Sequence, residues 1–261
     1  MTSHLIKAAF AAALCMVALS ACSPANKEAS APAQAPGAAQ IQAAATQGPL
    51  DAAAQKQIDA LIGAYLIAHP EAVEQALATL EARRQQDRFD QVASDTRNFS
   101  IGPADAKVHI VEFFDYRCVH CKEALAWSMD KIKNRKDVRF TFVEFPILTP
   151  NSLEASRAAI ASIKQGRYLD FHQRMMNSKG ELAAKEIDFY AQQAGIDVAR
   201  MRRDMEDGAI MGLLQKNHDV AAAAKVDGTP GFAINGKFFY GYDPDTLDKG
   251  LREALAGKTP A

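Results

Sequence analysis

Two cysteines separated by two residues follow an apolar run, and this arrangement constrains the fold more than any other feature. The segment from Val108 to Phe114 is rich in β-branched and aromatic residues, which predicts a buried strand. Cys118 and Cys121 come after a short turn, where a helix is predicted to begin and to continue over residues 121–135. The chain therefore contains a strand–turn–helix unit with the first cysteine at the start of the helix.

The beginning of a helix favours the thiolate form of a cysteine. Unpaired backbone N–H groups and the positive end of the helix dipole stabilise negative charge there. His120, between the two cysteines, adds a positive or hydrogen-bonding imidazole. We therefore expect the pKa of Cys118 to lie below the ordinary value of about 8.5. Because the reduced form is the one stabilised, the disulfide of this pair is expected to be oxidising.

The N-terminus is similar to a bacterial lipoprotein signal. Lys7 is followed by an apolar run over residues 8–19, which suits a signal-peptide core better than a membrane-spanning helix. The run ends in Leu19-Ser20-Ala21-Cys22, which resembles a lipobox. Residues 1–21 are thus predicted to be a signal peptide, and Cys22 a lipidation site that holds the mature chain at a membrane. The alternative is an ordinary secretory signal cleaved after Ala21. Both interpretations predict export.

Export gives the remaining cysteines a specific meaning. Of four cysteines, Cys15 lies in the predicted signal and Cys22 is the predicted anchor, so Cys118 and Cys121 remain for the folded part. In an oxidising compartment such a pair is either redox-active or part of a metal site. Zinc sites usually need four ligands, and the sequence has no second pair. The same cysteines, with His120, are soft ligands that suit Cu(I), which stays an alternative.

Composition excludes some classes of function and divides the chain. Hydrophobic residues make up 48% and charged residues 23%, so most of the chain can bury a core. The net charge is -1 and no basic block stands out, which argues against nucleic acid as the main partner. Residues 22–50 are rich in Ala, Pro, Gln, Ser and Gly and predict a flexible tether. Ser23 replaces the Asp that retains some lipoproteins at the inner membrane, which favours the outer membrane.

Residues 51–95 are predicted to form two helices that carry a thin apolar stripe. Pro70 marks the beginning of the second helix, which becomes highly polar after Leu80. The apolar residues recur at helical spacing: Ile58, Leu61, Ile62, Tyr65, Val73, Ala76, Leu77 and Leu80. Such a stripe needs a surface to pack against. The sequence leaves open whether this surface is the main domain or a second copy of the chain.

The main domain is predicted over residues 98–258. A second strand is expected over residues 139–145, and a mostly helical block over residues 151–224. Breaks in this block are expected near Gly166, Gly180 and Gly195. Asn235-Gly236 predicts a hairpin between strands over residues 232–234 and 238–240. Asp243-Pro244 begins a last helix.

Two motifs in this domain resemble the DsbA family of thioredoxin-fold proteins. The active-site segment is matched by Glu112-Phe113-Phe114-Asp115-Tyr116-x-Cys118-x-His120-Cys121-Lys122. The cis-proline loop and its hairpin are matched by Val226-Asp227-Gly228-Thr229-Pro230-Gly231-Phe232 and Asn235-Gly236. Residues 55–90 are also similar to the N-terminal helices of the suppressor-of-copper-sensitivity C branch. The resemblance implies an α/β, thioredoxin-like fold with an inserted helical subdomain, preceded by an N-terminal helical segment.

The resemblance also implies roles for individual residues. Cys118 would be an exposed sulfur that forms a mixed disulfide with a client protein, and Cys121 would be shielded and would resolve it. Glu112 would be a buried acid beneath the site that exchanges a proton as Cys121 changes state. Pro230 would be cis and would bring the backbone of Thr229 beside the sulfurs, where it pairs with an extended client chain.

The expected function is thiol–disulfide exchange in the periplasm. Clients would be unfolded or misfolded envelope proteins, and a membrane partner would exchange electrons with the site. No dissociable cofactor is required, because the dithiol is itself the redox group. Val119 replaces a Pro that many family oxidases carry between the first cysteine and the histidine. The sequence therefore leaves open whether the protein is an oxidase or an isomerase or reductase. Periplasmic Cu(I) binding is the alternative function.

Overall fold

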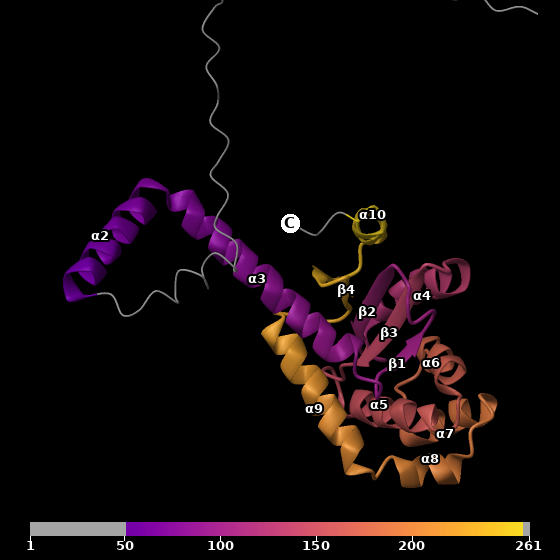
Figure 1. Cartoon of the computed structure of the whole chain (residues 1–261). Helices are drawn as coiled ribbons and strands as arrows, with labels where there is room; N and C mark the ends of the chain where they lie inside the picture. Colours follow the sequence, from indigo (N-terminus) through magenta and orange to yellow (C-terminus); the bar gives the residue numbers. More distant parts are fainter. Residues whose placement is uncertain (1–50, 258–261) are drawn as a thin grey trace, which may run out of the picture. The chain divides into compact units, whose positions relative to one another are not determined.

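The computed structural model describes residues 51–257, and Figure 1 shows how its elements are arranged. The described part contains one sheet with the strand order β1-β3-β2-β4-β5. The strands are β1 (Phe99–Ile101), β2 (Val108–Phe114), β3 (Val138–Glu144), β4 (Gly231–Ile234) and β5 (Lys237–Tyr240). The helices are α2 (Ala52–Ala68), α3 (Pro70–Ala93), α4 (Val119–Asn134), α5 (Pro150–Ile163), α6 (Tyr168–Met176), α7 (Ala184–Gln193), α8 (Val198–Asp204), α9 (Gly208–Ala223) and α10 (Pro244–Leu255).

Strands β2 and β3 form a parallel pair at the centre of the sheet, joined by helix α4. β1 pairs with β3, and β4 pairs with both β2 and β5, in each case antiparallel. The β4–β5 hairpin turns at Asn235 and Gly236, which have φ values of 45° and 89°. A two-residue turn of this kind needs left-handed backbone, which explains the Asn-Gly pair. The predicted mixed α/β, thioredoxin-like fold is confirmed.

Five helices, α5 to α9, are inserted between β3 and β4. The predicted breaks near Gly166, Gly180 and Gly195 all fall between helices of this insertion. A further break, before α9, was not predicted. There the side chain of Asp207 accepts a hydrogen bond from the backbone N–H of Ala209, 3.0 Å away. Asp is a favoured residue at this position because it satisfies an unpaired N–H of the first turn.

The sheet is covered on both faces, and successive residues of β2 alternate between the two cores. Val108, Ile110 and Phe114 pack in the larger core, which includes the helical insertion and the inner side of α4. Val111 and Phe113 pack in the smaller core on the opposite face. A strand buried on both sides appears in the sequence as a continuous apolar run, which is why the segment over residues 108–114 could be predicted.

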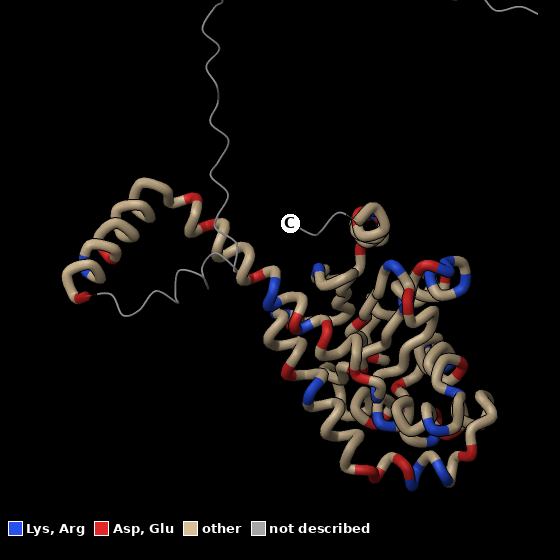
Figure 2. Tube along the Cα trace, in the orientation of Figure 1, with Lys and Arg blue, Asp and Glu red and all other residues tan. Residues whose placement is uncertain are grey.

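Helix α3 contributes to the smaller core through its C-terminal end. Phe89 and Val92 are its buried residues, and the helix contacts α9. Figure 1 shows the end of α3 meeting α9 beside the sheet. Acidic and basic residues are interspersed along the described chain rather than separated into patches of one sign (Figure 2). The predicted restart of the helix at Pro70 is confirmed.

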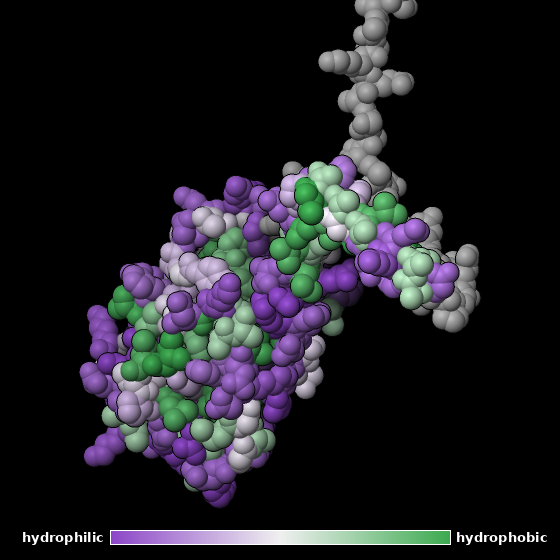
Figure 3. Space-filling model, turned by 90° about the vertical axis from the view of Figure 1, so that its left-hand side faces the viewer, coloured by the Kyte–Doolittle hydropathy of each residue, from purple (hydrophilic) through white to green (hydrophobic). Residues whose placement is uncertain are grey.

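The apolar stripe of α2 and the first half of α3 is exposed. No residue of α2 is buried, and Ile67 is 84% exposed. In α3, Leu77 is 61% exposed. The other large apolar side chains that are exposed on these helices are Ile58, Leu61, Ile62, Tyr65, Leu66, Val73 and Leu80. Hydrophobic side chains are visible on this part of the surface in Figure 3.

The predicted signal peptide over residues 1–21, the lipidation site Cys22 and the tether over residues 22–50 lie outside the described residues. Within residues 51–257, no helix has both the length and the apolar character needed to cross a membrane. Strand β1 was not predicted, because three residues are too few to show a period in the sequence.

Candidate active site

The two cysteines lie at the junction of β2 and α4. Cys118 is the residue that caps the N-terminus of α4, and its N–H donates to the carbonyl of Asp115, 3.0 Å away. Cys121 lies in the first turn of the helix. Both cysteines are free thiols in this structure. The turn between strand and helix therefore places Cys118 at the N-terminus of α4, where the first backbone N–H groups have no partner within the helix.

Cys118 is more covered than predicted. Its exposed fraction is 7%, against 0% for Cys121. The prediction of an exposed sulfur is therefore wrong, although Cys118 is the more accessible of the two, as predicted. The physical reason is the loop at Thr229, whose carbonyl oxygen accepts a hydrogen bond from the Cys118 thiol at 3.0 Å.

The pKa of Cys118 is lowered to about 5. The largest cause is the hydrogen bond from the Cys121 thiol, and burial acts in the opposite direction. The side chain of Thr229 and the backbone N–H groups of Cys121 and His120 lower the pKa further. Burial, together with the hydrogen bond to Cys118, raises the pKa of Cys121 far above its ordinary value. The pair therefore consists of one stabilised thiolate and one thiol that holds its proton.

The side chain of His120 interacts with Cys118 more weakly than with a carboxylate on its own helix. Its side chain is exposed, and Nδ1 lies 2.8 Å from the carboxylate of Glu123, one helical turn along. Glu123 is the largest cause of the raised pKa of His120, and Cys118 contributes least. The imidazole thus points to a partner on the helix surface. Its backbone N–H, rather than its side chain, appears among the groups that lower the pKa of Cys118.

The loop before β4 completes the site, although it lies far from the cysteines in the sequence. The Thr229–Pro230 peptide bond is cis, as the family resemblance implied. The next residue, Gly231, pairs with Phe113 of β2 and so brings the loop to the cysteines. A Cβ atom at Gly231 would lie 2.6 Å from Cγ1 of Val226, so glycine is required for this close approach.

Glu112 is buried in β2, with an exposed fraction of 2%. Its Oε2 accepts a hydrogen bond from the hydroxyl of Ser128 on α4, at 2.7 Å. Burial raises the pKa of Glu112 to about 8, Ser128 acts to lower it, and Cys118 raises it. The predicted location of Glu112 as a buried acid near the sulfurs therefore agrees with the structure. Its charge also raises the pKa of Cys121.

Asp115 was not singled out from the sequence, although it lies inside the motif. Its carboxylate accepts hydrogen bonds from the backbone N–H groups of Arg117, Ile147 and Leu148, at 2.7, 2.9 and 3.0 Å. The side chain is completely buried. Asp115 thus joins the turn before Cys118 to the loop that follows β3. An acidic residue directly after a buried strand was the available signal.

A second buried acid, Glu144 at the end of β3, was also missed. The hydroxyls of Tyr168 and Tyr116 donate to its Oε1, at 2.8 and 3.1 Å. Tyr116 also lies 3.1 Å from Nδ1 of the buried His172. Burial raises the pKa of Glu144 to about 8. The signal in the sequence was an acid at the end of an apolar strand, but its tyrosine partners come from the turn before Cys118 and from α6.

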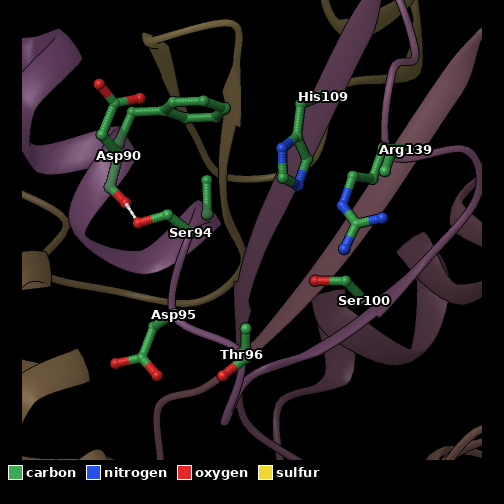
Figure 4. Close-up of a pocket in the computed structure, with 10 residues that line it drawn as sticks. Asp90, Ser94, Asp95, Thr96, Ser100, His109 and Arg139 are labelled. Atoms are coloured by element: carbon green, nitrogen blue, oxygen red, sulfur yellow. Dashed lines mark hydrogen bonds between the residues drawn. The ribbon is translucent and has the colours of Figure 1, made fainter.

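No group of three or more His, Cys, Asp or Glu residues able to hold a metal ion is found among the described residues. A pocket of about 320 Å³ opens at the end of β2 remote from the cysteines. Figure 4 shows His109 and Arg139 on one side of it and Asp90 and Ser94 on the other. None of the site residues predicted from the sequence lines this pocket.

Curated relatives match more than half of the chain. Na(+)/H(+) antiporter NhaA 3 of Salinispora tropica is 28% identical over 158 residues, which is 59% of this chain and 24% of the antiporter. The chain thus spans about a quarter of the length of such antiporters. The probable disulfide bond formation protein D of Bacillus anthracis is 25% identical over 187 residues, covering 66% of this chain and 84% of that protein.

Solved structures match more of the chain. A linker-deletion variant of Proteus mirabilis ScsC is 26% identical with a TM-score of 0.62, and the match covers 81% of this chain and 100% of that one. The thiol–disulfide exchange protein α-DsbA2 of Wolbachia pipientis is also 26% identical, with a TM-score of 0.60 and coverage of 67% and 97%. The family profile described as thioredoxin matches residues 93–253, more than half of the sequence. The chain therefore belongs to the thioredoxin family.

Proposed function

We propose that this protein catalyses thiol–disulfide exchange on unfolded or misfolded proteins of the bacterial cell envelope. The observation that carries the proposal is the contrast between the two sulfurs. Cys118 is a stabilised thiolate at the start of a helix, with a pKa of about 5. Cys121 is a buried thiol directly behind it. A thiolate of this kind is both a nucleophile and a good leaving group.

The chemistry follows from this contrast. When the pair is oxidised, a client thiolate attacks the sulfur of Cys118, the Cys118–Cys121 bond breaks, and Cys121 leaves and takes up a proton. A second client thiolate then attacks the client sulfur of the mixed disulfide, and Cys118 leaves as the thiolate. The client gains a disulfide, and two electrons stay on the enzyme as a dithiol. Because the pKa of Cys118 is low, this direction is favoured.

The reduced pair supports the reverse reaction. The Cys118 thiolate attacks a client disulfide, and either a client thiolate or Cys121 resolves the mixed disulfide. The first route reshuffles client disulfides, and the second reduces them. We propose that a membrane partner sets the redox state of the pair, so the same site serves disulfide formation or isomerisation.

The loop at Thr229 is proposed to hold the client. Its carbonyl lies 3.0 Å from the sulfur of Cys118, so a client chain that reaches this sulfur also reaches the backbone of the loop. Backbone hydrogen bonds recognise an extended chain without regard to its sequence, which suits an enzyme that acts on many unfolded clients.

Two further proposals concern location and assembly. Export and lipidation at Cys22 rest on the sequence over residues 1–22, and they would place the domain at a membrane, with the outer membrane favoured. Assembly of several copies through α2 and α3 is supported by their exposed apolar side chains, such as Leu77, because solvent exposure of such a stripe is unfavourable.

The test is exchange activity of the full mature chain on a reduced client and on a client with scrambled disulfides. We expect the wild type to act on at least one of them without added metal. The variant Cys118→Ser should be inactive, and Cys121→Ser should accumulate mixed disulfides with clients. No exchange by the wild type, combined with tight binding of one Cu(I), would instead support the copper-binding alternative.

A further inference from the structure

Ser128 is a buried hydroxyl on the helix that carries the cysteines. It lies seven residues after Cys121, two helical turns along α4, so both side chains lie on the inward face. Its exposed fraction is 0%. A serine inside a helix commonly donates to a carbonyl of its own helix. Here the hydroxyl instead donates to Oε2 of Glu112 on β2, at 2.7 Å.

This contact opposes the effect of burial on Glu112. Burial favours the protonated carboxyl, whereas a hydroxyl that donates to the carboxylate favours the ionised form. The pKa of Glu112 is about 8, and the hydrogen bond from Ser128 is the cause that lowers it. Without this donor, Glu112 would hold its proton more firmly at neutral pH.

The surroundings of Glu112 offer few competing groups. Its register neighbours on β3 and β4 are the apolar Phe142 and Phe232. The titratable groups linked to it electrostatically are Cys118, Cys121 and Tyr242. On the neighbouring α4 and α10, Asp248 forms an ion pair with Lys131 and accepts a hydrogen bond from Trp127. Among these neighbours, Ser128 donates a hydrogen bond to the carboxylate of Glu112.

We propose that Ser128 is a positioning residue, whose hydroxyl holds the carboxylate of Glu112 in place so that it can exchange a proton with Cys121. The proposal rests on the proposed thiol–disulfide exchange. Ser128 acts through Glu112 and does not touch the reacting sulfurs.

The proton and electrons balance as follows. With a client held on Cys118 as a mixed disulfide, the carboxylate of Glu112 takes the proton of the Cys121 thiol. The Cys121 sulfur attacks Cys118, the Cys118–Cys121 bond forms, and the bond to the client breaks. The client leaves as a thiolate and takes a proton from water. The enzyme pair is oxidised and the client reduced by two electrons. In the opposite direction Glu112 returns its proton to Cys121.

The experiment compares variants of the full mature chain that differ in this hydroxyl. Ser128→Thr keeps the hydroxyl, and Ser128→Val has nearly the same volume as the threonine variant but carries a methyl group in place of the hydroxyl. Ser128→Ala is a second loss variant. Ser162→Ala is the matched control, because Ser162 is also a buried helical serine but donates to the carbonyl of Ala159, at 2.6 Å. The rate at which Cys121 resolves a mixed disulfide is measured against pH.

We expect the pH profile of Ser128→Val and Ser128→Ala to move to higher pH by about one unit, the scale of a hydrogen bond to a charged group. In these two variants, Cys121 should resolve the mixed disulfide about tenfold more slowly at neutral pH, and the rate should approach that of the wild type at alkaline pH. Ser128→Thr and Ser162→Ala should keep the wild-type profile. In a Glu112→Gln background, loss of the Ser128 hydroxyl should have no further effect on the profile.

A uniform loss of rate at every pH, an unchanged profile, or a shift that persists without the Glu112 carboxyl would overturn the role of Ser128. A second readout does not depend on activity: the carboxyl carbon resonance of Glu112, followed by NMR, should titrate at higher pH in Ser128→Val than in Ser128→Thr. If the wild type lacks exchange activity, the proposed function fails, while this titration still decides whether Ser128 controls the ionisation of Glu112.

Discussion

The imidazole of His120 lies 2.8 Å from the carboxylate of Glu123, on the exposed side of the active-site helix. An ion pair at this i, i+3 spacing is common on helices. Glu123 is also the largest cause of the raised pKa of His120, and Cys118 is the smallest. The low pKa of Cys118 therefore depends mainly on its buried partner, Cys121, and on backbone groups.

The first prediction compares the contributions of Cys121 and His120 to the low pKa of Cys118. Cys121→Ala should raise the pKa of Cys118 from its value of about 5, because the variant lacks the hydrogen bond that contributes most to stabilising the thiolate. His120→Ala should raise it by a smaller amount. The rate of alkylation of Cys118 against pH measures both. A larger shift in the His120 variant would show that the imidazole, despite its contact with Glu123, is the main support of the thiolate.

The second prediction concerns stability against pH. Glu112 and Glu144 have pKa values of about 8 in the folded protein, against an ordinary value of 4.5. Between these values the folded state keeps protons that the unfolded chain releases, so the free energy of unfolding falls as pH rises from about 4.5 to about 8. The loss is on the order of several kcal/mol for each fully buried acid.

Glu112→Gln and Glu144→Gln should each flatten this dependence. Between pH 4 and pH 8 each variant should lose less of its free energy of unfolding than the wild type loses, because an amide cannot ionise. Denaturant unfolding at several pH values measures the effect. Parallel curves for a variant and the wild type would show that the acid is not protonated in the folded state at neutral pH.

The third prediction concerns Asp115, whose carboxylate joins the turn before Cys118 to the loop at Ile147 and Leu148. Asp115→Ala should cost about 2 kcal/mol of stability, because backbone N–H groups lose their acceptor. Asp115→Asn keeps one acceptor oxygen and should cost less. Asp105→Ala, at an exposed position, is the control and should change stability by less than about 0.5 kcal/mol. An equal cost for Ala and Asn would contradict the importance of these bonds.

The fourth prediction tests assembly. Leu77→Lys should shift the protein to a smaller species in light scattering, because Leu77 is 61% exposed and belongs to the apolar stripe of α2 and α3. Gln75→Lys, which adds the same charge at an exposed polar position of the same helix, should leave the mass unchanged. A wild type that is monomeric at high concentration would rule out self-association through this stripe.

Much of the fold followed from local patterns in the sequence. The run from Val108 to Phe114 could be assigned as a strand because both of its faces are buried. The turn at Asn235 and Gly236 could be assigned because its backbone needs left-handed residues. The location of Cys118 at the start of α4 followed from the same reasoning. In each case the physical cause lies within a few neighbouring residues.

The features that were missed depend on contacts between distant segments. Glu144 is held by Tyr116 and Tyr168, which lie in the turn before Cys118 and in α6. The low exposure of Cys118 comes from a loop 111 positions away. The periodic pattern of apolar residues in a sequence does not show which distant segments contact each other. The contact between His120 and Glu123, by contrast, has helical spacing and was open to prediction.

The distance in sequence between Cys118 and Thr229 has a consequence for how the protein matures. The thiol and the carbonyl that meet at the site are brought together by the pairing of β2 with β4, after five inserted helices. Closing so long a loop is entropically costly, and contacts of this kind form slowly. A chain still being synthesised or exported, with β4 not yet in place, therefore has the cysteine pair without its cover.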